Sequence, residues 1–194
     1  IMGNLATEDH LKALSGSDVS LLHIATHGFY QTEETAKDST VVTFASNQRP
    51  AESNALSRSG LFMAGASAVF DETPIPSNVD DGILTALEIS HLDMTNVNLV
   101  TLSACETALG KLGDDGVYGL QRGFKNAGVH TLLMSLQNVY DTSTAELMIA
   151  FYRNMTRGMS KREALVRAQR ELRDKGLNDE KHWATFVLLD AYDE

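Results

Sequence analysis

Residues 99–110, LVTLSACETALG, contain an apolar run that stops at a polar turn bearing a glycine. The run Leu99–Leu102 has the composition of a buried strand, and Cys105, the single cysteine of the chain, follows it closely. A cysteine that serves as a small hydrophobe normally lies inside such a run. Its place at the end of the run raises a second interpretation, a thiol that meets a substrate.

The rest of the chain alternates between strand-like and helix-like periodicity. Strands are expected at residues 19–26 (ended by Gly28 and covered on both faces), 97–105, 129–136 and 183–191, with a strand or hairpin arm at 60–70. Helix starts are expected at Thr7, Asp81, Asp115, Ser143 (with Glu146) and Ser160 (with Glu163). This alternation predicts an α/β fold with a mainly parallel sheet and helices on both faces.

Length and composition narrow the function classes. The 194 residues, 43% hydrophobic and 22% charged, suit a single compact domain over 1–194. A net charge of −10 argues against nucleic acid as a direct ligand and fits a basic partner or substrate. No apolar run is long enough to cross a membrane. One cysteine fits a reducing, cytoplasmic compartment, and a first residue Ile1 suggests a piece of a longer protein.

A histidine stands where it can meet the cysteine. His27 follows one expected strand and Cys105 ends another, and the carboxyl ends of neighbouring parallel strands share one edge of a sheet. An imidazole in reach of a thiol can take its proton and return it to a leaving amine. The backbone N–H groups of Gly28 and Cys105 are candidates for an oxyanion hole.

Other interpretations of these residues remain open. His10, His23, His27 and His91 make a zinc site with Cys105 conceivable, but the ligand spacing of a structural site is absent, so we expect no metal and no cofactor. Thioesterase chemistry lacks a Gly-x-Cys-x-Gly turn. A catalytically idle binding scaffold is the alternative from another class.

Six ordered blocks then carry a resemblance. They are LLHIATHG (21–28), DGILTALEIS (81–90), LVTLSACETALG (99–110), GVYGLQRGFKNAGVHTLLMSL (116–136), STAELMIAFYRNM (143–155) and HWATFVLLD (182–190). Together they resemble the CHAT domain, a family of caspase- and separase-like cysteine peptidases. The resemblance implies a caspase-like sheet and a bacterial-type thiol protease that cuts peptide bonds.

Residue by residue, the resemblance implies roles for several positions. His27 matches the catalytic histidine, Cys105 the nucleophile and Gly28 the oxyanion position. Glu106 matches a family glutamate that we expect to hold the turn behind the pair rather than to take part in the chemistry. His23 matches another family position behind the pair, and a hydrogen-bonded core histidine is the favoured interpretation. Asp141 matches an aspartate of the pocket for the residue before the cut in relatives that prefer basic residues, and a solvated loop aspartate is the alternative. Gln137 and Tyr140 depart from the family pattern, and Tyr140 is expected to narrow or re-line that pocket.

The resemblance also implies features around the domain. Family members usually have a further strand upstream of the first helix, which this chain lacks, and often follow helical repeats that act as a sensor. We expect activation by such a region, by a partner chain or by processing. We also expect the polar segment 30–60 to be partly disordered in the inactive form and to complete the substrate cleft when ordered.

Overall fold

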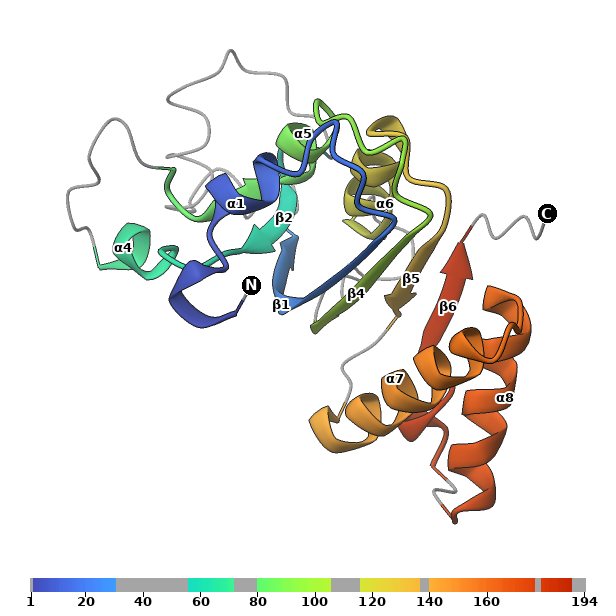
Figure 1. Cartoon of the computed structure of the whole chain (residues 1–194). Coiled ribbons are helices and arrows are strands. Elements are labelled where there is room, and N and C mark those ends of the chain that lie inside the picture. Colours follow the sequence, from blue (N-terminus) through green and yellow to red (C-terminus); the bar gives the residue numbers. More distant parts are fainter. Residues whose placement is uncertain are drawn as a thin grey trace.

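A six-stranded sheet in the order β3-β2-β1-β4-β5-β6 forms the centre of the protein (Figure 1). The computed structural model describes residues 2–30, 56–71, 80–105, 116–136, 140–176 and 179–189. The strands are β1 (Leu21–Tyr30), β2 (Ser59–Phe62), β3 (Ile83–Thr85), β4 (Leu99–Cys105), β5 (Leu132–Ser135) and β6 (Phe186–Leu189). The central pairs β1–β4 and β4–β5 are parallel, and the outer pairs are antiparallel. The sheet is therefore mixed, with β1, β3, β4 and β5 pointing one way and β2 and β6 the other. The expected α/β fold with a mostly parallel sheet is confirmed.

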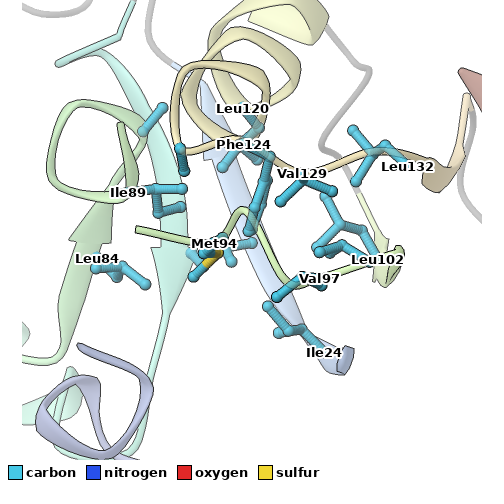
Figure 2. Close-up of a cluster of buried hydrophobic side chains, with 14 of the residues drawn as sticks. Ile24, Leu84, Ile89, Met94, Val97, Leu102, Leu120, Phe124, Val129 and Leu132 are labelled. Atoms are coloured by element: carbon cyan, nitrogen blue, oxygen red, sulfur yellow. The ribbon is translucent and has the colours of Figure 1, made fainter. Parts of the chain in front are cut away.

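Helices cover both faces of this sheet, as expected. The helical segments of the described residues are η1 (Gly3–Leu5), α1 (Glu8–Lys12), α4 (Ser67–Phe70), α5 (Ala86–Ile89), α6 (Gly116–Asn126), α7 (Asp141–Thr156), α8 (Lys161–Asp174) and η2 (Glu180–His182). One core joins α5 and α6 to the sheet; Figure 2 shows Phe124 and Leu120 of α6 facing Ile89 and the strand residue Leu102. The other core joins α7 and α8 to β4, β5 and β6. Among the described helices, none has the length and apolar character that a bilayer crossing requires.

Two of the expected helix starts are confirmed. Thr7 caps α1 by accepting a hydrogen bond from the backbone N–H of His10. Ser160 and Glu163 form a reciprocal capping box at the start of α8. The expected start at Asp115 lies outside the described residues.

The expected start at Asp81 is wrong. Asp81 accepts a hydrogen bond from the backbone N–H of Ile83, which opens strand β3. The helix begins after that strand, where Thr85 and Glu88 form the capping box of α5. Pairing with β2 therefore takes residues that the periodicity assigned to a helix.

The expected start at Ser143 is also wrong. Tyr140 occupies the N-cap position of α7 without a side-chain cap bond, and Asp141 is the first helical residue. Ser143 lies inside the first turn, where its hydroxyl donates to the backbone carbonyl of Tyr140 over 3.1 Å. Asp141 consequently lies at the positive end of the helix dipole, where a carboxylate is favourable.

Strand β1 differs from its prediction in length and in exposure. It continues through Gly28 to Tyr30 because β2 pairs with its last four residues. Alternate residues of its first part (Leu21, His23, Ala25 and His27) are exposed rather than covered. The core under α7 and α8 accordingly contains no buried residue of β1.

An ion cluster ties α1 to the segment before β3. The ammonium group of Lys12 lies 2.6 Å from Glu8, 3.1 Å from Asp80 and 3.5 Å from Glu88. Glu8 is only 2% exposed and also accepts a hydrogen bond from the backbone N–H of Gly82. Burial raises the pKa of Glu8 to about 7, against the opposing effect of Lys12. Burial alone would lower the pKa of Lys12, but its bonds to Glu8 and Asp80 raise it.

Candidate active site

The backbone brings His27 and Cys105 together. β1 and β4 run parallel through seven residue pairs, from Leu21 with Leu99 to His27 with Cys105. Paired strands lie about 4.8 Å apart, so these two residues are direct cross-strand neighbours at the carboxyl end of the ladder. The side chain of His27 is exposed there. Both strands and their adjacency follow the sequence-based expectation.

His27 pairs with both strands that flank β1. It is the residue of β1 that is paired on both sides, with Cys105 in β4 and with Phe62 in β2. Gly28, the next residue, is buried and pairs with Leu61 on the β2 side, beyond the last residue that β4 matches. The peptide of Gly28 therefore lies next to the end of β4.

A polar network lies two to four residues before the pair on the same two strands. The hydroxyl of Tyr152 in α7 donates to Thr101 over 2.9 Å and lies 3.2 Å from Nδ1 of His23. Because its single hydrogen goes to Thr101, Tyr152 accepts from His23, which is therefore protonated at Nδ1. The other ring nitrogen of His23 accepts from Ser103 over 3.2 Å.

The network has a clear electrostatic character. Although His23 is exposed as a residue, Tyr152 packs against its ring, and the resulting partial desolvation lowers the pKa of His23, which favours the neutral ring. Burial raises the pKa of the Tyr152 phenol, which keeps its hydrogen in place. His23, expected to support the catalytic pair from behind, thus joins β1, β4 and α7. Tyr152 was missed by sequence reasoning because only the tertiary fold places it against β1.

The start of α7 holds the two residues expected at the substrate pocket. Tyr140 is 52% exposed, and Asp141 is exposed beside it. Tyr140 stacks on His182 of η2, with ring centroids 4.8 Å apart and planes at 30°. No role was expected for His182 from the sequence. Its position just before the last strand could have indicated one, because β6 runs antiparallel to β5 and therefore begins at the edge of the sheet where β5 ends.

The start of α7 lies toward the end of the sheet at which β4 finishes (Figure 1). Tyr152 lies against Thr101, and Tyr140 precedes it by twelve residues, about 18 Å along a helix. Cys105 lies four residues beyond Thr101, about 13 Å along a strand. His27, Cys105, Tyr140 and Asp141 therefore share one edge of the fold.

Some expected features lie elsewhere or outside the described residues. A pocket of about 620 Å³ follows the first part of β1; its lining includes His10, His23 and Thr26 but not His27, so it adjoins the site without containing it. No three His, Cys, Asp or Glu side chains in the described ranges are placed to hold a metal ion. Glu106, Gln137 and most of segment 30–60 lie outside those ranges.

A family match covers almost the whole chain. The CHAT domain profile matches residues 1–191. The chain belongs to the CHAT domain family. The mostly parallel six-stranded sheet with helices on both faces agrees with the caspase-like α/β fold that the resemblance implied.

Two curated relatives of this CHAT domain are tetratricopeptide repeat protein 28 from Homo sapiens and from Mus musculus. Each is 25% identical over 197 residues, which cover 97% of this chain. The match spans only 8% of the length of either relative.

Proposed function

We propose that this CHAT domain is a cysteine endopeptidase with Cys105 as nucleophile and His27 as general acid and base. The observation that carries the proposal is the parallel β1–β4 register, which makes the two residues cross-strand partners at the exposed end of the ladder. Cross-strand neighbours carry their side chains on the same face of a sheet, which supports pairing the thiol with the imidazole as an activated nucleophile. The family supports a peptidase-like fold.

The proposed reaction needs only these groups and water. His27 takes the thiol proton of Cys105, and the thiolate attacks the carbonyl carbon of the scissile peptide. The oxyanion that forms accepts hydrogen bonds from the backbone N–H groups of Gly28 and Cys105. Collapse breaks the C–N bond, with His27 giving its proton to the leaving amine and a thioester left on Cys105. Water, deprotonated by His27, then hydrolyses the thioester and releases the carboxylate product and the free thiol. Glu106 supports the turn after the nucleophile.

The proposed substrates are proteins with a basic residue before the cut. Asp141 lies exposed at the same edge as the pair, and a carboxylate there attracts a guanidinium or ammonium group. The net charge of −10 adds a general attraction for basic segments.

We further propose that this single domain acts as part of a longer, cytoplasmic protein. The two relatives named for tetratricopeptide repeats are far longer than the matched region, which supports a helical-repeat partner region. In this proposal the repeats, or a partner chain, activate the peptidase and bring it substrate.

Two single substitutions test the reaction. Cys105→Ala and His27→Ala should each abolish cleavage of basic peptides by the full-length parent protein, while His91→Ala, at an exposed histidine away from the site, should leave it unchanged. Alkylation by iodoacetamide at neutral pH gives a readout independent of activation: His27→Ala should slow modification of Cys105, because the thiol loses its base. Wild-type turnover in His27→Ala would rule out the proposed pair.

A further inference from the structure

The start of α7 carries an ordered aromatic surface that the proposed reaction does not yet use. His182 covers one side of the Tyr140 ring, at a centroid distance of 4.8 Å and an interplanar angle of 30°. The Tyr140 side chain is nevertheless 52% exposed, so the ring is available to a ligand. An exposed aromatic ring that packs on a second ring is restricted before any ligand arrives.

Hydrogen bonds fix the supporting ring. The hydroxyl of Ser143, a residue only 5% exposed, donates its single hydrogen to the backbone carbonyl of Tyr140. Its oxygen can therefore only accept from Nδ1 of His182, which lies 3.2 Å away. His182 is thus held as the Nδ1-protonated ring, bound to the same turn that carries Tyr140. The backbone and the ring of Tyr140 are both held through Ser143 and His182.

The charge beside this surface is negative. Asp141 follows Tyr140 directly and is exposed. Asp179 and Glu180 precede His182 in the chain, with Lys181 as the one cation between them and the ring. A cationic ligand is therefore favoured over an acidic one.

An aromatic face next to a carboxylate distinguishes between the two common cations. A guanidinium group is planar, so it can stack on a ring and pair with a carboxylate through two N–H groups. A lysine ammonium group is a compact point charge that can pair with the carboxylate but cannot stack as a plane. Tyr140 and Asp141 together therefore fit arginine better than lysine.

We propose that Tyr140 and Asp141 select arginine over lysine as the residue before the cut, and that His182 is the positioning residue that holds Tyr140 for this contact. The inference rests on the proposed peptidase function and names the substrate class of that same site. Asp141 supplies the attraction for either cation, and Tyr140 supplies the preference between them.

The test compares matched peptides that differ only in Arg, Lys or Leu before the cut. Tyr140→Ala and His182→Ala should each lower the Arg-over-Lys ratio of kcat/KM by about twofold to fivefold, mainly through KM, with the Leu peptide unchanged. Tyr140→Phe keeps the ring and should keep the ratio. Asp141→Asn should weaken Arg and Lys peptides together, and His91→Ala is the matched control. His182→Phe keeps the stack without the bond to Ser143, so it covers a folding failure of His182→Ala and should give a smaller loss of the ratio.

A binding assay separates this inference from the proposed function. Labelled Arg and Lys peptides are titrated against the Cys105→Ala protein by fluorescence anisotropy, with and without Tyr140→Ala or His182→Ala, so that no bond is cut. A wild-type protein that cleaves peptides, but whose Arg-over-Lys ratio is unchanged by these substitutions in both assays, overturns the inference and leaves the peptidase intact. A wild-type protein that neither cleaves nor binds the peptides overturns both.

Discussion

The hydroxyl of Tyr152 lies 3.2 Å from Nδ1 of His23, although the two residues are 129 positions apart in the chain. Their rings also contact, with centroids 5.7 Å apart. This contact joins α7, which carries the proposed substrate pocket, to β1, which carries the proposed base. A substitution at Tyr152 should therefore affect both the proposed substrate pocket and the proposed base.

Tyr152→Phe removes the hydroxyl and retains the ring. We expect a loss of about 1–2 kcal/mol in the free energy of unfolding, since two hydrogen bonds go and Thr101 and His23 lose a partner. Urea unfolding measures the loss, and Ile149→Ala, an exposed site on the same helix, is the control. A double cycle with Thr101→Val should be non-additive; independent effects would show that the bond contributes nothing.

The protonation of His23 provides a second prediction. Desolvation lowers its pKa, so the unfolded chain binds more protons at this site in mildly acid solution, and stability rises with pH until the ordinary histidine range is passed. The ¹⁵N shifts of His23 should show the neutral, Nδ1-protonated ring at pH 7. His23→Gln should remove this part of the pH dependence. A positively charged ring at pH 7 would contradict the network.

Lys12→Met should destabilise the protein in a pH-dependent way. The pKa of Glu8 is raised to about 7, so the folded state binds the extra proton and this site loses stability as pH rises from about 4.5 through 7. Without Lys12 the buried carboxylate of Glu8 has lost its partner. We expect the free energy of unfolding to fall by about 2–3 kcal/mol at pH 8 and by less at pH 5.5. Adding Glu8→Gln should flatten the profile. An equal cost at both pH values would exclude Glu8 as the titrating group.

Gly123→Ala should separate α5 from α6. A Cβ at Gly123 would lie 2.6 Å from the backbone oxygen of Ala86, which cannot move without shifting α5. The clash, of about 1–3 kcal/mol, should exceed the gain in helix propensity of about 1 kcal/mol. Thermal unfolding measures the balance, with Gln121→Ala on the same helix as control. A raised Tm would mean that the helices have room to part.

Chelators should leave peptide cleavage unchanged. Two of the four imidazoles that made a zinc site conceivable have other partners: His23 bonds to Tyr152 and Ser103, and His10 lies 2.7 Å from the hydroxyl of Thr7. EDTA at millimolar concentration is the reagent, and the cleavage rate is the readout. Inhibition that added zinc reverses would restore the metal interpretation.

The sequence was sufficient for the fold class and for the strands that carry the pair, because apolar runs and the parallel-sheet rule bear directly on both. It was misleading where local patterns were identical. Ser143 and Ser160 both precede a glutamate by three residues, yet only Ser160 caps a helix. Gly158, with a φ of 85°, follows the end of α7, so a new helix has to begin after it and Ser160 is free to cap that helix. Before Ser143 the helix begins earlier, at Asp141.

Tertiary contacts account for what the sequence did not reveal. The stack of Tyr140 on His182 and the bond between Tyr152 and His23 each join distant segments, and no local pattern records them. The extension of β1 past Gly28 likewise depends on β2, whose register determines how far the strand runs.

The double pairing of His27 has a consequence for motion. Its peptide lies where two ladders overlap, with β4 on one side and β2 on the other, so freeing it requires both ladders to open. Opening two ladders costs more than opening one, so amide hydrogen exchange around His27 should be slower than at Phe29 and Tyr30, which pair with β2 alone. The proposed base is thus held on both sides, and a conformational change that tunes the site would act around it rather than move it.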